Sequence, residues 1–279
     1  MSEPIIFYDI VSNAKAKAWS PNTWKARICL NIKNIPYKTI WVEFPDIEDV
    51  CKKIGAQATG QKPDGRPHYT LPAIYDPNTK AAVSDSMTIA RYLDKTYPET
   101  RVVLSVEADA FTVMFEESFW SVFPTYGPFN IIVPPLYRIL RPASQPYFRK
   151  TREERLGKFE ELAPPGSTKR AEKWEETRQG LHRIATWLGA APDSSGEEKL
   201  FFMGSKVGIT FADIRLASFF IWFKTCLGED SEEWKDMIAW DGGRWARFTA
   251  AFEEFEVVDD GEDLESARAH LNVTAMGRK

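Results

Sequence analysis

Residues 71–83 read LPAIYDPNTKAAV and predict a β-hairpin. A short apolar run is followed by a turn rich in Asp, Pro and Asn, and a second short run follows the turn. Over residues 84–97 the apolar period becomes helical, because Ile89 and Leu93 fall on one face. We therefore expect a strand–turn–strand–helix unit over this part of the chain.

Four elements are expected upstream of the hairpin. Residues 5–10 and 37–42 are rich in β-branched and aromatic residues, so both predict strands. Between them a Ser-Pro pair opens a helix at residue 21, since Ser is a favoured N-cap and Pro a favoured first helical residue. Residues 46–54 predict a short helix, and residues 55–69 predict a loop. The order β-α-β-α-β-β-α is that of a thioredoxin-like domain, an α/β fold with a four-stranded mixed sheet and helices on both faces.

The rest of the chain predicts helices, with no strand run from residue 104 onward. A capping box marks one helix start, because Asp213 can accept a hydrogen bond from the backbone N–H of Thr210. We expect a thioredoxin-like domain over residues 1–98 and an all-α helical-bundle domain over residues 104–279. The amphipathic stretches are residues 105–123, 151–159, 169–188 and 211–226.

The composition argues against several classes of function. The net charge is -4 and no long basic run occurs, so neither nucleic acid nor an anionic membrane is expected as a partner. Three cysteines, Cys29, Cys51 and Cys226, are too few and too far apart for a disulfide framework, and the His residues lack metal-ligand spacing. No apolar run is long enough to cross a membrane, and residues 1–8 do not resemble a signal peptide. We therefore expect a cytoplasmic protein without a metal site.

Two helix starts carry polar residues suited to binding an anion. At residues 20–23, SPNT, the first N–H groups of a helix can stabilise a thiolate; the alternative is that Ser20 is only an N-cap. At the start of the helix after the hairpin, Ser86 suits a carboxylate and Asp85 an ammonium group, as in an α-amino acid head group. A plain helix cap is the alternative there too.

A third position is Leu71-Pro72, at the start of the first hairpin strand. The proline nitrogen cannot donate a ladder hydrogen bond. If the peptide bond is cis, the backbone of Leu71 turns outward and can pair with an extended peptide ligand; a trans bond is the commoner alternative.

In this order and on this fold, the three positions resemble the glutathione-binding set of the glutathione transferase family. Residues 84–93, SDSMTIARYL, resemble the family's Glu-Ser-x-x-Ile-x-x-Tyr-Leu signature, with Asp85 where Glu is commoner. The capping box at Thr210 also matches the helical domain of that family, so the resemblance covers nearly the whole chain. Residues 20–25, SPNTWK, look most like the fungal etherase-like class, whose bacterial relatives cleave aryl ether bonds.

The resemblance implies a role for each position in binding glutathione. Ser20 would face the glutathione sulfur, with Asn22 and Thr23 as close alternatives. No cysteine stands at this helix start, unlike in the omega-like classes. The peptide contacts would come from Leu71, Pro72, Asp85 and Ser86, and Gln61, Lys62, Arg66 and His68 compete for the glycine carboxylate.

A second substrate is expected in a pocket between the two domains, walled by the first helix of the bundle. A plain helix–helix core is the alternative for these residues. The charge-rich residues 152–155 are expected to be a solvated face. The pocket residues would be Phe115, Phe119, Trp120, Phe123 and Tyr126.

The function implied by the resemblance is that of a glutathione transferase. It would activate glutathione, its co-substrate, as a thiolate and direct it at an aromatic or electrophilic molecule. The reaction would be conjugation (as in detoxification), peroxide reduction or thiolytic ether cleavage. The alternative is a carrier of aromatic metabolites with little turnover, and a purely structural module predicts no glutathione binding. Homodimers are common in the family, and the sequence leaves the oligomeric state open.

Overall fold

The computed structural model describes residues 3–189 and 198–268 of the chain. Its contacts divide these residues into two compact units. The first unit comprises residues 3–102, 141–144 and 255–268, and the second comprises the described residues of 103–140 and 145–254. Among the described helices, none is both long and apolar enough to span a membrane.

The first unit is built on a five-stranded sheet with the strand order β6–β5–β1–β2–β7. Strand β1 runs parallel to β2 and antiparallel to β5, and β5 runs antiparallel to β6. The expected thioredoxin-like arrangement is therefore confirmed. The strands are β1 (Ile5–Ile10), β2 (Tyr37–Val42), β5 (Ala73–Asp76), β6 (Ala81–Ser84) and β7 (Glu262–Asp263).

The strand register brings three segments to one end of this sheet. Tyr8, near the carboxyl end of β1, lies opposite Ala73, the first residue of β5. Ala73 in turn lies opposite Ser84, the last residue of β6. Residues 71–72 and 85–86 are therefore neighbours just beyond the strand ends, at the end of the sheet where the chain leaves β1.

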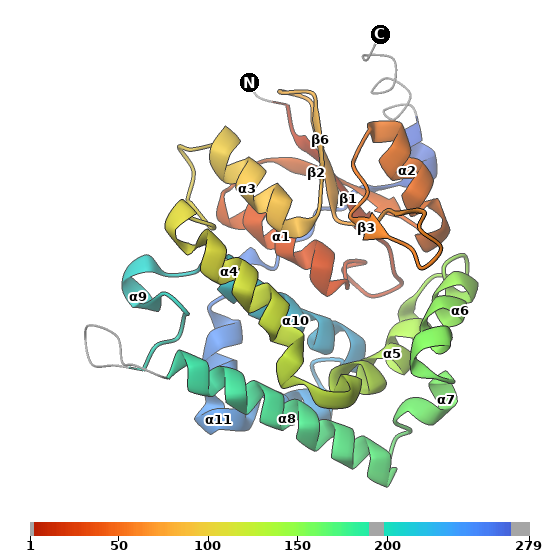
Figure 1. Cartoon of the computed structure of the whole chain (residues 1–279), viewed down its shortest axis with the longest axis vertical. Helices are drawn as coiled ribbons and strands as arrows, with labels where there is room; N and C mark the ends of the chain where they lie inside the picture. The colour runs from red at the N-terminus through yellow and green to blue at the C-terminus, as the bar shows by residue number, and fades with distance from the viewer. Residues whose placement is uncertain (1–2, 190–197, 269–279) are drawn as a thin grey trace. The chain divides into compact units, whose positions relative to one another are not determined.

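Three helices complete the thioredoxin-like unit. Helices α1 (Pro21–Ile32) and α3 (Ser86–Thr96) pack side by side, whereas α2 (Ile47–Ile54) lies on the other side of the strands (Figure 1). Helix α2 ends, as predicted, at Gly55, which has a left-handed φ of 79°. The N-cap of α3 is Asp85.

The segment over residues 55–69 contains more structure than the expected loop. Strands β3 (Gly60–Gln61) and β4 (Pro67–His68) pair with each other in an antiparallel two-stranded sheet. Both strands are exposed and only two residues long. They therefore lack the alternating apolar pattern from which a strand is predicted.

The prediction of a four-stranded sheet, with no strand after residue 104, is wrong. Strand β7 adds to the free edge of β2, where Glu262 lies opposite Ile40 and Asp263 opposite Trp41. Two acidic residues have no strand propensity of their own, so the edge of β2 decides this pairing.

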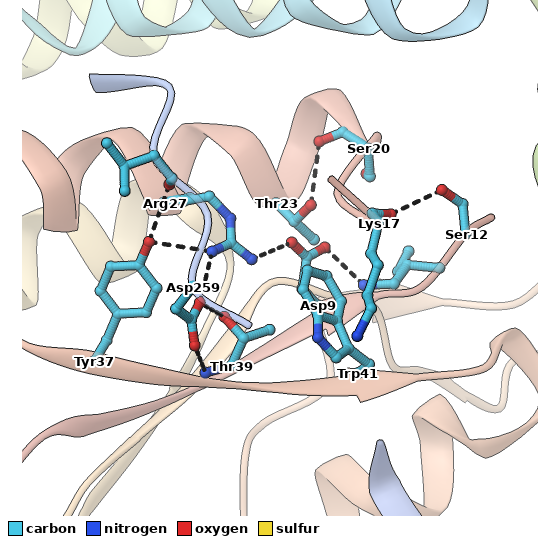
Figure 2. Close-up of polar contacts among 12 residues, drawn as sticks. Asp9, Ser12, Lys17, Ser20, Thr23, Arg27, Tyr37, Thr39, Trp41 and Asp259 are labelled. Atoms are coloured by element: carbon cyan, nitrogen blue, oxygen red, sulfur yellow. Dashed lines mark hydrogen bonds and ion pairs between the residues drawn. The ribbon is translucent and has the colours of Figure 1, made fainter. Parts of the chain in front are cut away.

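The residues that lead into β7 also contact the first unit; we call residues 255–263, which include β7, the C-terminal strap. The Asn31 amide donates to the carbonyl of Phe255 at 2.7 Å. Asp259 accepts the backbone N–H of Thr39 at 2.8 Å (Figure 2). The Trp41 indole donates to the carbonyl of Asp260 at 3.0 Å. These contacts place the strap in the thioredoxin-like unit, whereas the sequence assigned it to the helical domain. The expected ranges 1–98 and 104–279 otherwise stay a prediction.

Arg27 of α1 joins the strap to the sheet. Its side chain is buried and forms ion pairs with Asp9 of β1 at 2.8 Å and with Asp259 of the strap at 3.2 Å (Figure 2). The rings of Phe7 and Trp41 lie 4.8 and 5.4 Å from the guanidinium carbon. Burial alone would lower the pKa of Arg27, but Asp9 and Tyr37 raise it above its usual value, so the buried charge is retained.

The second unit is helical, as predicted. Helix α10 (Phe211–Leu227) is its core and packs against α4, α5 and α11. The predicted capping box is present: the Thr210 N–H donates to the Asp213 carboxylate at 2.8 Å. Burial raises the pKa of the Asp213 carboxyl to about 6, although the hydrogen bonds that it accepts act to lower this pKa. The other helices are α4 (Val106–Phe119), α5 (Gly127–Ile139), α6 (Gln145–Leu156), α7 (Phe159–Leu162), α8 (Thr168–Leu188), α9 (Gly204–Val207) and α11 (Glu232–Ala250).

The sequence predicted the helices of this unit unevenly. The helix expected over residues 151–159 is divided into α6 and α7, because Gly157 between them has a φ of 89°. Helix α5 was not predicted; it contains Pro134 and Pro135, which each remove a helical N–H donor. Its buried face against α8 and α10 stabilises it in spite of the two prolines.

Candidate functional site

Ser20 occupies the N-cap of α1, at the end of the sheet where Leu71-Pro72 and Asp85-Ser86 meet. Its side-chain oxygen accepts the backbone N–H of Asn22 at 3.3 Å. The hydroxyl of Thr23 donates to the backbone carbonyl of Ser20 at 3.1 Å (Figure 2). Ser20 is 3% exposed and Thr23 0%, whereas Asn22 is exposed.

The two buried hydroxyls, of Ser20 and Thr23, therefore differ in whether their proton is available to a ligand. A hydroxyl carries one proton, and that of Thr23 is already donated to the carbonyl of Ser20. Within the described part of the chain, the Ser20 hydroxyl acts only as an acceptor, so its proton is free for a ligand. The first N–H groups of α1 lie beside it and favour negative charge.

Leu71-Pro72 precedes strand β5, and its peptide bond is cis. Residues of neighbouring elements contact this segment at Thr70. The Thr70 hydroxyl lies 2.8 Å from that of Thr59, and the thiol of Cys51 contacts the Thr70 carbonyl. Leu71 itself is buried. These contacts tie the end of the sheet to helix α2 and to the β3–β4 segment.

Asp85 and Ser86 form the start of helix α3. One carboxylate oxygen of Asp85 accepts the N–H groups of Met87 and Thr88 at 3.1 and 2.9 Å. Asp85 has a φ of 74°, an unusual backbone conformation for a residue with a side chain. Strain of this kind is typical of ligand-binding turns. Ser86, the first residue of the helix, follows Asp85 directly and is 4% exposed.

The candidates for the glycine carboxylate differ in their present partners. Lys62 forms an ion pair with Glu48 at 2.7 Å, and Arg66 one with Asp64 at 2.6 Å. Hydrogen bonds from Lys52 and Lys62 lower the pKa of Glu48 to about 2. His68 is exposed on β4, in the same two-stranded sheet that adjoins Thr70.

None of the cysteines lies at the start of α1. Cys29, Cys51 and Cys226 are all buried and unbridged. Burial raises the pKa of each thiol, that of Cys51 to about 11, so none of them is an activated thiolate. Among residues 3–189 and 198–268, no group of three or more His, Cys, Asp or Glu side chains is arranged to hold a metal ion.

The five aromatic residues expected to line a pocket have different surroundings in the helical unit. Phe119 is fully buried and packs on Phe219, and Phe115 packs on Phe202, with ring centroids 5.6 and 4.6 Å apart. The other three line a hollow of about 360 Å³ within this unit. The hollow is lined by Trp120, Phe123, Tyr126, Pro128, Phe129 and Arg155.

Pro128, Phe129 and Arg155 were missed as lining residues. The first two belong to the unpredicted helix α5, and Arg155 was assigned to a solvated face. Arg155 is exposed, but its guanidinium carbon lies 5.3 Å from the Tyr126 ring and 5.5 Å from the Phe129 ring. The aromatic run that ends at Phe129 was the available signal in the sequence.

Comparison with known proteins gives consistent matches for both halves of the chain. Residues 110–255 match the family profile described as "Glutathione S-transferase, C-terminal domain", and residues 19–96 match "Glutathione S-transferase, N-terminal domain". Among curated proteins, the glutathione S-transferase-like protein ustS of Aspergillus flavus is 29% identical over an alignment of 288 residues, and the match covers 96% of this chain and 96% of the other.

Solved fungal structures are more similar. The glutathione S-transferase CsGST63524 of Ceriporiopsis subvermispora, solved in complex with glutathione, is 51% identical, with a TM-score of 0.87. The glutathione transferase GSTFuA3 of Phanerochaete chrysosporium is 48% identical, with a TM-score of 0.84. In both cases the match covers 93% of this chain and 100% of the other.

Proposed function

This chain belongs to the glutathione S-transferase family, and from that premise we propose that it binds glutathione at the sheet end formed by Ser20, Leu71-Pro72 and Asp85-Ser86. Ser20 donates its hydroxyl proton to the glutathione sulfur and stabilises the thiolate. The bound thiolate then attacks an aromatic or electrophilic second substrate by conjugation, peroxide reduction or thiolytic ether cleavage.

The observation that carries this proposal is the free proton of the Ser20 hydroxyl at a helix N-terminus. Lowering a thiol pKa from about 8.5 to about 6.5 requires roughly 2.7 kcal/mol in favour of the thiolate. A hydrogen bond to a charged group contributes about 1.5–3 kcal/mol, and a helix N-terminus about 0.3–1 kcal/mol. One hydroxyl and one helix start are therefore sufficient, and no general base is needed. Because the proton of Thr23 is already engaged, Ser20 is favoured over Thr23 for this role, and exposed Asn22 is the remaining alternative.

The rest of glutathione fits the polar groups around Ser20. The backbone of Leu71 pairs with the cysteinyl part of the peptide, next to the cis bond to Pro72. Ser86 takes the γ-glutamyl carboxylate through its hydroxyl and the helix N–H groups, and Asp85 takes the ammonium group. Lys62 or His68 takes the glycine carboxylate. The resemblance of residues 20–25 to the etherase-like class supports a serine-type transferase.

Calorimetry of glutathione binding, combined with the ultraviolet absorbance of the bound thiolate at neutral pH, tests this proposal. We expect the wild type and Thr23→Val to bind glutathione and show the thiolate signal. Ser86→Ala should weaken binding about tenfold, the effect of losing a hydrogen bond to a charged group. Ser20→Ala should bind glutathione but lose the thiolate signal.

Other outcomes point to other functions. Binding without a thiolate signal in any protein would favour a carrier of aromatic metabolites. No binding by the wild type would leave only the fold in common with the family. Loss of the signal in Thr23→Val but not in Ser20→Ala would show that the wrong hydroxyl has been assigned.

A further inference from the structure

We propose that the hollow in the helical unit binds a flat aromatic molecule carrying a negative charge, and that Arg155 selects for this charge. The hollow is the one lined by Trp120, Phe123, Tyr126, Phe129 and Arg155. The inference rests on the proposed function only in taking the second ligand to be aromatic. It adds the charge of that ligand and the residue that recognises it.

The shape of the hollow suits a flat aromatic ligand. Its volume of about 360 Å³ is at the lower end of the range of small-molecule sites. Trp120 and Phe129 lie 4.7 Å apart with their planes at 37°, and the Tyr126 ring stands edge-on to Phe129 at 6.2 Å. Aromatic rings prefer such offset and edge-to-face contacts, so a flat ligand gains the same contacts on entering.

The lining rings are held in place from behind. Phe123 stacks on Phe219 at 5.2 Å with an interplanar angle of 15°, and it also packs against the backbone of Gly180 on α8. Phe129 packs on the buried Trp222 at 5.4 Å. Because these contacts exist without a ligand, the rings need little reordering on binding, which favours affinity.

Arg155 provides the charge recognition. Its guanidinium carbon lies over the Tyr126 and Phe129 rings, at the hollow itself. Across residues 3–189 and 198–268, no carboxylate forms an ion pair with it, whereas Arg149 on the same helix pairs with Glu153 and Glu160. An anionic group on a ring stacked in the hollow can therefore accept hydrogen bonds from an uncommitted guanidinium.

Two probes that differ only in charge test the inference. 8-Anilinonaphthalene-1-sulfonate carries a sulfonate, and N-phenyl-1-naphthylamine has the same rings without it. Both are titrated by fluorescence into the full chain, in the absence of glutathione. For Arg155→Gln we expect the Kd of the sulfonate probe to rise about tenfold, the effect of losing one charge-assisted hydrogen bond, and the Kd of the neutral probe to change less than twofold.

Matched variants separate charge recognition from general effects. Arg155→Lys keeps the charge and should bind the sulfonate probe with intermediate affinity. Arg183→Gln removes an exposed charge on α8 that does not line the hollow, and should leave both probes unchanged. An unchanged sulfonate Kd in Arg155→Gln, or an equal loss of both probes, would overturn the inference. Since glutathione is absent, this result does not depend on whether the Ser20 site binds glutathione.

Discussion

At the scale of single residues, the proposed chemistry depends on which hydroxyl still has a proton to donate. Ser20 and Thr23 are both buried at the start of α1, and both are residue types able to stabilise a thiolate. The hydrogen bond from Thr23 to the Ser20 carbonyl uses the proton of Thr23. One local contact thus separates two residues that are equivalent in the sequence.

Gly180 illustrates how a residue without a side chain can shape the aromatic hollow. A Cβ atom at this position would lie 2.4 Å from the Phe123 ring and 2.9 Å from the Val122 carbonyl. We expect Gly180→Ala to lower the free energy of unfolding by about 1–3 kcal/mol, because the overlap outweighs the better helix propensity of Ala. The displaced Phe123 ring should also weaken binding of N-phenyl-1-naphthylamine. Urea unfolding and fluorescence titration measure the two effects.

Gly189→Ala is the control for this prediction. An added Cβ there meets its nearest atom at 3.4 Å, an ordinary contact. The double variant Gly180→Ala/Phe123→Leu should recover part of the lost stability, since the smaller side chain relieves the overlap. If Gly180→Ala were as stable as the wild type, the close packing of Phe123 on α8 would be contradicted.

At the scale of elements, the β5–β6 hairpin and helix α3 position the residues proposed to bind glutathione. Asp76, at the end of β5, is fully buried and accepts the hydroxyls of Tyr92 and Tyr97, both at 2.6 Å. The Asn78 N–H in the turn donates to the same carboxylate at 2.9 Å. Asp76 therefore fixes the hairpin relative to α3, which begins at Asp85-Ser86.

The dependence of the unfolding free energy on pH should reflect the hydrogen bonds that the Asp76 carboxylate accepts. Burial by itself raises the pKa of Asp76, but the hydrogen bonds from Tyr92, Tyr97 and Asn78 lower it below its ordinary value of 3.8. A carboxyl whose pKa is lower in the folded chain than in the unfolded chain stabilises the fold. This stabilisation is fully present above the pKa of the unfolded chain and is lost as the pH falls through the pKa of the folded chain. Asp76→Asn should therefore lose about 2–3 kcal/mol at pH 7 and show a flatter decline of stability below pH ~4.

Urea unfolding at a series of pH values measures this effect. Asp64→Asn is a suitable control, because Asp64 is exposed and its partner Arg66 lies two residues away on the surface. If the unfolding free energy fell with the same slope at acidic pH in Asp76→Asn and in the wild type, Asp76 would not stabilise the folded state through its charge.

At the scale of the whole molecule, the first unit is completed by residues from both ends of the described chain. The C-terminal strap covers the edge of β2 and ends the sheet with β7. Gly261 lets it approach closely, since its φ is 58° and an added Cβ would lie 2.5 Å from the Trp41 indole nitrogen and 2.7 Å from the Thr39 carbonyl.

Gly261→Ala should therefore detach the strap from β2. We expect a loss of about 2–4 kcal/mol in unfolding free energy, from the strained φ and the overlap with the backbone of β2. Faster hydrogen exchange at the amides of β2 should accompany it. Gly60→Ala is the matched control, because an added Cβ there meets nothing within 4 Å. Unchanged exchange in β2 would contradict the proposed contribution of the strap.

The parts of the fold that were predictable are those with a strong local signal. Strands β1 and β2, the Ser20 start of α1, the Asp85 start of α3 and the Thr210–Asp213 capping box each follow from a few neighbouring residues. Their backbone conformation and hydrogen bonds are decided within one or two turns of chain. The thioredoxin-like order and the helical second half were therefore readable from the sequence.

The features that the sequence missed depend on contacts between distant residues. Strand β7 exists because the edge of β2, more than 200 residues earlier, offers it hydrogen bonds. Arg155 lies at an aromatic hollow because α6 packs against α5, which no local pattern of charges indicates. The sequence by itself determined which elements form and where two helices present their N–H groups. The hydrogen bond from Thr23 to the Ser20 carbonyl, within the first turn of α1, decides which hydroxyl keeps its proton. Only the tertiary structure decided which charge meets the aromatic rings, because this depends on packing between helices that forms only in the folded chain.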